Sequence, residues 1–437
     1  MADLISSKIA KAWVVAVNMG YGHQRTAFPL RNLAPDGKVI NANGYRGIPN
    51  KDKISWEGTR KVYEFISNFK KIFLIGDFVF FIFNQFQKIL NFYPKRDLSR
   101  PNFQLKEIYS LIKSGWGKHL IEKLKKNPLP IISTFFTQAF MAEFFNYPGD
   151  VFCVICDADI ARPWAPIYPK KSRVKYFAPT ERAVERLKLY GVRQENIFLT
   201  GYPLPQENIG TEELDILKQD LKYRLLNLDR CKRYSCQYQS LIQRYLGDLP
   251  KSPDHPLTVM FSVGGAGAQR EIGIKILKNL ADQIKKGDIR IILVAGVKEK
   301  IKEYFQKNIY NLGLENNPNV ETVYAKTMEE YFLEFNKKLR KTDILWTKPS
   351  ELSFYSALGV PIIIAPPVGS QEDFNQRWLL KSGFGMMQEN PEYLSQWFFD
   401  WLESGYFAEA AMQGFIEGKK LGTFNIEKIL CGLQLHS

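Results

Sequence analysis

A histidine stands in the first glycine-containing turn of the chain. The β-branched apolar run 13–17 is followed by Gly20, Gly22 and His23, and then by a segment that can be helical up to Pro35. A turn of this kind between a strand and a helix sets the imidazole at the mouth of the strand, beside a helix N-terminus. Because histidine is the natural general base near neutral pH, the turn predicts a group that removes a proton. The alternative is a pair of packing glycines with an incidental histidine.

A second glycine-containing loop stands in the later half of the chain. Gly264, Gly265 and Gly267 leave the apolar run 257–263 and precede a helical stretch. Small residues there let backbone N–H groups approach a diphosphate, and the dipole of the following helix adds favourable potential. The glycines do not complete a GxGxxG pattern, which disfavours a dinucleotide site.

Polar residues gather directly after two consecutive predicted strands, 344–347 and 361–365. At these strand ends polar side chains can bind the phosphates and hydroxyl groups of a ligand. The alternative is two capped helix starts, with Ser350 and Ser370 as the caps. The polar residues are Lys348, Ser350, Glu351, Gln371, Glu372 and Asn375.

The elements that must position these residues form two alternating series of strands and helices. Alternation of this kind predicts parallel sheets, so the fold class is α/β. Two series in a chain of 437 residues predict two facing Rossmann-like domains with a central cleft, since ligands bind at the carboxyl ends of such strands. The expected parts are an N-terminal domain 1–204, a helical connector 205–256 between prolines, and a C-terminal domain 257–437.

The formal net charge of +15 is concentrated in one segment. Residues 51–126 contain 16 Lys and Arg against 7 Asp and Glu, together with a run of aromatic residues. The most apolar piece, 72–83, is interrupted by Asp77 and is much shorter than the roughly 20 residues that cross a bilayer. Such a segment predicts binding at the interface of an anionic membrane. The alternatives are a buried helix with a solvated basic face, and nucleic-acid binding, which no matching motif accompanies.

The cysteines favour a reducing compartment. They number five, and the N-terminus lacks the long apolar core of a secretory signal, so we expect a cytoplasmic protein. Cys153 and Cys156 form a CxxC inside an apolar run, where their odd spacing points them to opposite faces of a strand. No second cysteine pair with ligand spacing follows, so we expect neither a metal nor another cofactor.

The order of these motifs resembles the GT-B glycosyltransferases, the group that includes the peptidoglycan enzyme MurG, the plant galactolipid synthases and the bacterial diacylglycerol glucosyltransferases. The turn ending in His23 resembles their first glycine-rich loop. Asp157 and Asp159, followed by Trp164, resemble a galactolipid-synthase segment in which a strand ends in an aspartate and a tryptophan follows. The other matching segments are 177–203, 264–265, 347–349 and 369–375.

For the N-terminal domain, the resemblance implies an acceptor site. The acceptor would lie near Gly20 and Gly22, and His23 would remove its proton. Asp157 or Asp159 would orient the histidine or serve as an alternative base.

For the C-terminal domain, the resemblance implies a site for the donor, a uridine diphosphate sugar. The diphosphate would lie against the loop of Gly264, Gly265 and Gly267, and against Lys348 and the helix start at Ser350 and Glu351. The donor sugar hydroxyls would contact Gln371, Glu372 and Asn375.

The activity implied is inverting transfer of a hexose or N-acetylhexosamine to a lipid or lipid-linked hydroxyl. The enzyme would be peripheral at the inner face of the membrane, with no nucleic acid as partner. The sequence departs from the pattern of these glycosyltransferases at two places. Ser350 and Glu351 replace the usual Gly-Gly pair, and Ser356 replaces the usual ribose-binding acid. They keep two alternatives open: a nucleotide-sugar epimerase on the same fold, and a non-catalytic GT-B module that binds a nucleotide sugar.

Overall fold

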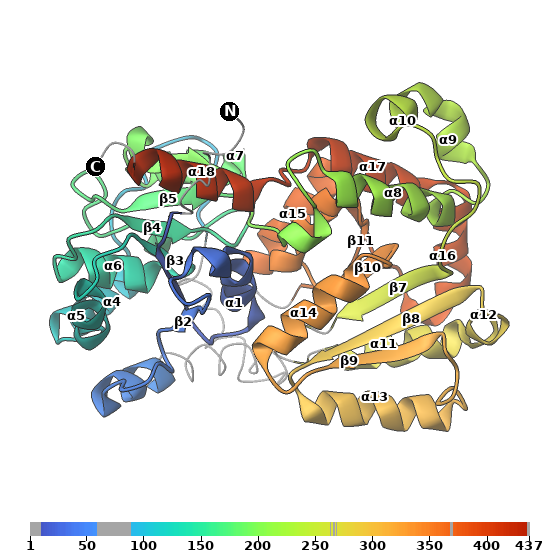
Figure 1. Ribbon diagram of the computed structural model, residues 1–437, viewed down its shortest axis with the longest axis horizontal. Helices are drawn as coiled ribbons and strands as arrows, with labels where there is room; N and C mark the ends of the chain where they lie inside the picture. Colours follow the sequence, from blue (N-terminus) through green and yellow to red (C-terminus); the bar gives the residue numbers. More distant parts are fainter. Residues whose placement is uncertain are drawn as a thin grey trace, which may run out of the picture. The chain divides into compact units, whose positions relative to one another are not determined.

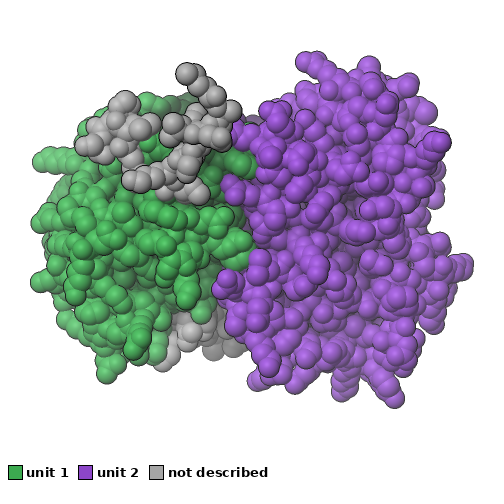
Figure 2. Space-filling view, viewed as in Figure 1, with its two compact units in different colours: residues 1–203, 368–371, 421–437 green, residues 204–367, 372–420 purple. Residues whose placement is uncertain are grey.

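The computed structural model contains two compact units, coloured separately in Figure 2. Unit 1 comprises Met1–Pro203, Val368–Gln371 and Leu421–Ser437, and unit 2 comprises Leu204–Pro367 and Glu372–Lys420. The residues that the structure describes are 10–58, 89–262, 264, 267, 269–367 and 370–434.

Unit 1 is built on a six-stranded parallel sheet with the order β2-β1-β3-β4-β5-β6 (Figure 1). Its central strands are continuous apolar runs that are buried along their length, as expected for parallel strands covered on both faces. In register, Val15 of β1 pairs with Ile40 of β2 and with Ser133 of β3, so three strands end at one edge. The strands are β1 (Trp13–Ala16), β2 (Ile40–Asn41), β3 (Ile131–Ser133), β4 (Val151–Val154), β5 (Lys175–Ala178) and β6 (Ile197–Leu199).

The helices of unit 1 begin at residues that satisfy their first backbone N–H groups. The Thr180 side chain accepts a hydrogen bond from the backbone N–H of Ala183, and the Asn102 side chain accepts one from Leu105. The helices are α1 (Tyr21–Ala27), η1 (Phe28–Leu33), α4 (Phe103–Lys113), α5 (Lys118–Lys125), α6 (Phe136–Phe144), η2 (Arg162–Trp164), α7 (Glu181–Leu189), η3 (Gln194–Asn196) and α18 (Gly422–Gln434).

Helix α18 completes the core of unit 1, although the sequence pattern places it with the C-terminal domain. Ile426 and Leu430 are one helical turn apart and fully buried in the cluster that contains Val14. The Asn425 side chain also donates a hydrogen bond to the Thr200 carbonyl, at 2.8 Å. Figure 1 shows α18 in red among the green and blue elements of unit 1.

Unit 2 contains a second six-stranded parallel sheet, with the order β12-β11-β10-β7-β8-β9. The α/β class and the two sheets predicted from the sequence are therefore confirmed. Strand β12 follows the predicted strand 361–365 as the last strand of this sheet, and the segment after Ser350 is a 3-10 helix. The strands are β7 (Leu257–Ser262), β8 (Ile289–Gly296), β9 (Val320–Tyr324), β10 (Ile344–Thr347), β11 (Ile362–Ile364) and β12 (Gly385–Met387).

The helices of unit 2 cover this sheet, and α13 runs alongside β9 (Figure 1). A capping box at Thr327 and Glu330 fixes the start of α14. The helices are η4 (Gln206–Asn208), α8 (Asp215–Leu228), α9 (Arg233–Gln237), α10 (Gln239–Leu246), α11 (Arg270–Asn279), α12 (Ala281–Lys286), α13 (Glu299–Asn311), α14 (Met328–Leu339), η5 (Glu351–Leu358), α15 (Ser370–Ser382), η6 (Pro391–Tyr393), α16 (Leu394–Glu403) and α17 (Tyr406–Glu417).

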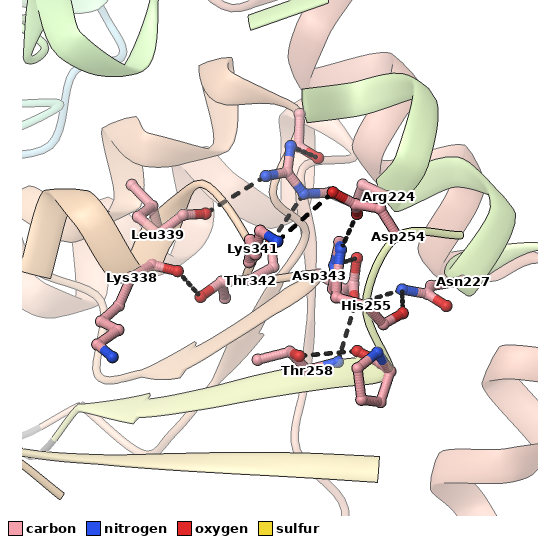
Figure 3. A network of polar contacts seen from close by, with 12 residues as sticks. Arg224, Asn227, Asp254, His255, Thr258, Lys338, Leu339, Lys341, Thr342 and Asp343 are labelled. Atoms are coloured by element: carbon pink, nitrogen blue, oxygen red, sulfur yellow. Dashed lines mark hydrogen bonds and ion pairs between the residues drawn. The ribbon is translucent and has the colours of Figure 1, made fainter. Parts of the chain in front are cut away.

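The segment expected as a connector, 205–256, packs into unit 2 through a buried arginine. The Arg224 guanidinium of α8 donates to the carbonyls of Thr342 and Leu358, at 2.8 and 2.9 Å. Figure 3 shows this contact beside the turn that precedes β10. Because a buried guanidinium needs partners for its donors, these carbonyls fasten α8 to the sheet.

A second buried group holds the end of the same segment. The His255 ring lies between two carboxylates, with Nε2 3.2 Å from Asp343 and Nδ1 against Asp254 (Figure 3). Asp343 also accepts hydrogen bonds from Asn227 and from the backbone N–H of Thr258. Burial lowers the pKa of His255, but the carboxylates of Asp343 and Asp254 outweigh it and raise this pKa above its ordinary value.

The basic aromatic segment falls only partly within the described residues. The aromatic residues from Phe73 to Phe86 lie outside them. In the part of the chain that the structure describes, no helix combines the length and the apolar character needed to cross a membrane.

Candidate functional site

The first candidate group, His23, lies in unit 1 just beyond the carboxyl end of β1. Gly20 precedes helix α1 with φ of 100°, a backbone conformation that residues with a Cβ rarely adopt. This turn allows α1 to begin at Tyr21, so His23 stands in the first helical turn. Gly22, the other glycine of the predicted acceptor loop, is part of the helix itself.

His23 and Thr134 hold each other through two hydrogen bonds. His23 Nδ1 lies 2.8 Å from the Thr134 carbonyl oxygen, and Thr134 Oγ1 donates to the His23 carbonyl, also at 2.8 Å. A carbonyl oxygen can only accept, so Nδ1 carries the proton and Nε2 carries the lone pair. Thr134 directly follows β3, the neighbour of β1, and the sheet order therefore brings the two residues together.

The surroundings of His23 keep it neutral. Its ring centroid lies 4.7 Å from that of Phe135 and 6.3 Å from that of Trp164. Burial lowers the pKa of His23 to about 4, against a smaller opposing effect of the Thr134 carbonyl. At neutral pH the side chain is thus an imidazole with an unprotonated Nε2, which can accept a proton from a hydroxyl group.

The sulfur atom of Cys156 contacts both His23 and Asp157. Cys156 Sγ lies 3.4 Å from His23 Nδ1 and 3.9 Å from Asp157 Oδ2. The direct partner of Nδ1 is the Thr134 carbonyl, where the sequence predicts a carboxylate. Thr134 lies inside the apolar run 131–135, and nothing in the sequence distinguishes it from its neighbours.

Asp159 forms a buried ion pair, whereas the sequence predicts a base or an orienting partner of His23. Both of its carboxylate oxygens accept hydrogen bonds from Arg186, each at 2.8 Å, and Asp159 is only 3% exposed. Its Oδ1 also accepts from the backbone N–H of Ile160. A buried carboxylate committed in this way fixes α7 to the turn after β4 and does not fit the predicted roles of base or orienting partner.

The glycine loop of the second candidate site leaves β7 in unit 2. Gly264 and Gly267 have φ of 68° and 67°, while Gly265 lies outside the described residues. A Cβ on Gly264 would stand 2.8 Å from Lys348 Cε, and one on Gly267 would stand 2.9 Å from Ile301 Cδ1. Both the backbone conformation and the close neighbours therefore require glycine at these two positions.

Lys348 and Glu372 meet at this loop. Thr347 of β10 pairs in register with Ser262 of β7, so Lys348 follows β10 beside the start of the loop. Its aliphatic stem lies against Gly264, and its ammonium group forms an ion pair with Glu372 of α15. The sequence-predicted residues Gly264, Lys348 and Glu372 are thus brought together, with a cation at the loop.

The remaining predicted donor residues differ in how far they can reach a ligand. The Ser350 side chain accepts from the N–H of Leu352 and caps η5, which Glu351 begins. Gln371 and Glu372, in the first turn of α15, are partly exposed.

Two polar side chains of unit 2 that follow β10 and β11 in the sequence are fully buried. Asn375 is 0% exposed and donates to the Pro349 carbonyl, so it positions the turn after Lys348, and the predicted direct contact with sugar hydroxyls does not fit. Ser356 is also 0% exposed, and its hydroxyl donates to the Ser353 carbonyl at 2.7 Å. The position of the expected ribose-binding acid therefore presents no group to a ligand.

Comparisons with known proteins find one matching family model and several similar curated proteins. Residues 250–339 match a protein family described as a domain of unknown function (DUF6938). The chain is 23% identical over 267 residues to a processive diacylglycerol beta-glucosyltransferase of Bacillus licheniformis, covering 59% of this chain and 57% of that protein. It is 24% identical over 315 residues to a protein of the same name from Staphylococcus aureus, covering 71% and 68%.

A solved structure with a different activity is also similar. The UDP-GlcNAc 2-epimerase from Neisseria meningitidis, bound to UDP-GlcNAc, matches with a TM-score of 0.45 and 14% identity, over 78% of this chain and 84% of that one. A likeness of this size does not distinguish one activity from another. By the order of its motifs and its similarity to diacylglycerol glucosyltransferases, the chain resembles the GT-B glycosyltransferases.

Proposed function

We propose that the chain is a glycosyltransferase that moves a sugar from a nucleoside diphosphate sugar to the hydroxyl group of a lipid or lipid-linked acceptor. The observation that carries this proposal is the geometry of His23. Its Nδ1 is held by the Thr134 carbonyl, which leaves Nε2 as an unprotonated acceptor at the carboxyl edge of the sheet. The similarity to two diacylglycerol glucosyltransferases supports the class of donor and acceptor.

In the proposed reaction, unit 1 binds the acceptor and His23 receives its proton. The acceptor oxygen forms a bond to the anomeric carbon as the bond from that carbon to the diphosphate breaks, which inverts the configuration. The leaving diphosphate takes the electron pair, and the proton on Nε2 passes to solvent. Because the pKa of His23 is low, the ring releases this proton readily and is ready for the next turnover.

Unit 2 binds the donor in this proposal. The loop at Gly264 and Gly267 and the N-terminus of α11 offer positive potential to the diphosphate. Lys348 adds a cation once the phosphate competes with Glu372 for it. Glu372, in the first turn of α15, would then contact the sugar hydroxyls.

The membrane part of the proposal rests on exposed charge in unit 1. Helices α4 and α5 present lysines to solvent, among them Lys106, Lys113 and Lys118. Each basic residue near an anionic surface contributes about 1 kcal/mol of binding. The protein is therefore proposed to be cytoplasmic and peripheral, and co-sedimentation with anionic vesicles should weaken as salt is raised. Equal binding to neutral and anionic vesicles, or none to either, contradicts this part.

One observation favours a second candidate, a non-catalytic module that binds a nucleotide sugar. The buried hydroxyl of Ser356 stands at the position where the resemblance to the GT-B glycosyltransferases implies an acid for the ribose. A lower affinity for the nucleotide is consistent with a protein that binds a nucleotide sugar without catalysing its reaction.

The deciding experiment incubates the purified protein with several UDP-sugars and total membrane lipid. Free UDP together with a glycosylated lipid supports the transferase, and loss of both in His23→Gln ties the reaction to the proposed base. A changed UDP-sugar without lipid product indicates an epimerase. Binding by calorimetry without turnover indicates the non-catalytic module.

A further inference from the structure

The sulfur atom of Cys156 is a second neighbour of the His23 nitrogen that the Thr134 carbonyl holds. Cys156 Sγ lies 3.4 Å from His23 Nδ1, and the Thr134 carbonyl oxygen lies 2.8 Å from the same nitrogen. Thr134 follows β3 and Cys156 follows β4, and these two strands pair in register. Two neighbouring strands therefore place one atom each beside the same ring nitrogen.

The groups on either side of Cys156 set the direction of its hydrogen bonds. His23 Nδ1 carries a proton, because the Thr134 carbonyl oxygen can only accept. On the other side, the Cys156 thiol donates to Asp157 Oδ2 at 3.9 Å, and an ionised carboxylate can also only accept. The thiol proton thus points to Asp157, which leaves the lone pairs of the sulfur to face the Nδ1 proton.

One hydrogen bond alone does not fix an imidazole ring. It sets the distance from Nδ1 to one acceptor, but the ring can still rotate about the line that joins the two atoms. A second acceptor on a different strand removes that freedom and fixes the plane of the ring. Nε2 belongs to the same rigid ring, so its direction is fixed as well.

Burial makes the contact with the sulfur persistent. Cys156 is 4% exposed, and Trp164, whose ring lies 6.3 Å from that of His23, is 2% exposed. The Phe135 ring packs against the imidazole at 4.7 Å. Because little water reaches this nitrogen, little water can compete with the sulfur for the Nδ1 proton.

The other cysteine of the CxxC pair provides a natural comparison. Cys153 lies in β4, is 0% exposed and pairs in register with Ser133. Its thiol has no hydrogen-bond partner among the described residues. Burial raises the pKa of this thiol, so it stays protonated and inert. Cys153 is thus a buried thiol of the same strand region without a contact to His23.

We propose that Cys156 is a positioning residue of the base. Its sulfur shares the Nδ1 proton of His23 with the Thr134 carbonyl and holds the ring so that Nε2 keeps one direction. Asp157 takes part through the thiol, whose proton it accepts. The hold on the ring rests on the geometry alone, whereas its use in sugar transfer rests on the proposed function.

The first test observes the ring without any reaction. The four histidines of the full chain are labelled with ¹⁵N, and His23→Gln assigns the His23 signal. At pH 7 the Nδ1 proton should exchange with water about twofold to fivefold faster in Cys156→Ala than in the wild type, as expected for loss of one weak hydrogen bond. Cys156→Ser should lie between the two, because its oxygen keeps both roles but stands farther from Nδ1 on a shorter bond.

Cys153→Ala is the matched control for this exchange measurement. Both alanine variants remove a buried thiol, so a purely structural role of Cys156 predicts the same exchange of the His23 proton in both. Wild-type exchange in Cys156→Ala, or equal acceleration in Cys153→Ala, overturns the proposal. Where thermal unfolding shows that Cys156→Ala does not fold, Cys156→Ser replaces it, and wild-type exchange in that variant then overturns the proposal.

The second test follows turnover with a UDP-sugar and a lipid acceptor. Cys156→Ala should lower kcat about tenfold and leave KM for both substrates unchanged, because a rotating ring presents Nε2 less often while substrate binding stays the same. Cys153→Ala should keep the wild-type kcat. Wild-type kcat in Cys156→Ala sinks the positioning role and leaves the transferase standing. Faster proton exchange in Cys156→Ala, without transfer by the wild type to any acceptor, supports the hold on the ring and rejects the proposed function.

Discussion

Two histidines of this protein, one in each unit, have opposite surroundings. His23 faces a carbonyl oxygen at the carboxyl edge of its sheet, and burial lowers its pKa to about 4. His255 precedes β7 at the amino edge of the other sheet, and two carboxylates raise its pKa. The first is neutral with one nitrogen available, and the second lies between two carboxylates in a closed network.

The difference shows that the charge of the partner decides what a buried histidine does. A neutral carbonyl fixes the tautomer without stabilising the imidazolium, so the ring remains a base. Asp343 and Asp254 stabilise the imidazolium and hold the chain leading into β7 to the turn before β10. The surroundings of His23 therefore favour a role as a base, and those of His255 favour a role in the stability of the fold.

The largest effect should come from His23→Gln. Glutamine can still donate to the Thr134 carbonyl but offers no base, so turnover should fall by about 10² to 10⁴. The thermal unfolding midpoint should change little, since glutamine keeps the hydrogen bond to the Thr134 carbonyl. His119→Gln, at an exposed histidine of unit 1, is the matched control and should keep full turnover. Substantial turnover by a well-folded His23→Gln protein removes His23 as the base.

Asp343→Asn should have the next largest effect, and on stability alone. The change leaves His255 without its buried carboxylate and sets an amide against the N–H of Thr258. We expect the free energy of unfolding to fall by about 3 to 5 kcal/mol in urea titrations. For the control Asp248→Asn, at an exposed aspartate, the free energy of unfolding should fall by less than about 0.5 kcal/mol. Equal midpoints for the two variants would show that the network around His255 does not support unit 2.

The pH dependence of stability should separate the two histidines by sign. The pKa of His23 is lower in the folded state than its ordinary 6.5, so the unfolded state binds the extra proton and stability falls as pH drops from 6.5 towards 4. Between pH 7 and pH 5 this contribution amounts to about 2 kcal/mol. The pKa of His255 is raised, so its contribution is present below 6.5 and is lost as pH rises through the folded value.

Urea midpoints at pH 5, 7 and 9 check these signs. The difference in urea midpoint between the wild type and His23→Gln should change between pH 5 and 7. The difference for His255→Gln should change as pH rises above the ordinary 6.5. Parallel curves for both variants would contradict the contrast between the two sites.

The smallest effect should come from Thr134→Val. The valine keeps the carbonyl that holds Nδ1 but loses the hydroxyl that donates to the His23 carbonyl. Loss of one such bond should reduce stability by about 1 kcal/mol, with a turnover loss of about tenfold. Thr137→Val is the control, because the Thr137 hydroxyl is buried and has no partner among the described residues. A larger loss in Thr137→Val than in Thr134→Val would mean that the hydroxyl does not position His23.

Much of the fold could be predicted because local patterns determine it. Apolar β-branched runs predict the strands, and helical spacing and caps predict the helices between them. The alternation of the two predicts two parallel sheets. The glycine turn before His23 and the loop at Gly264 follow from the same local signals. Their positive φ values depend on a few neighbouring residues only.

What the sequence could not predict depends on which strands become neighbours. Thr134 lies next to His23 only because β3 pairs with β1. Asp159 meets Arg186 across a turn and a helix, and a pattern that reads an aspartate after a strand as reactive cannot detect this partner. The burial of Asn375 likewise follows from packing, and no motif distinguishes it from the partly exposed Gln371.

Helix α18 has a consequence for the order in which the chain folds during synthesis. Asn425 and its partner Thr200 are 225 residues apart, and a ribosome adds about 5 to 20 residues per second. Roughly 10 to 45 s therefore pass between the synthesis of β6, the last strand of unit 1, and that of Ile426 and Leu430, which cover its apolar core. During that interval the nascent chain exposes a surface that chaperones recognise, so ribosome-bound chains stalled before α18 should be captured by chaperones far more than chains stalled after it.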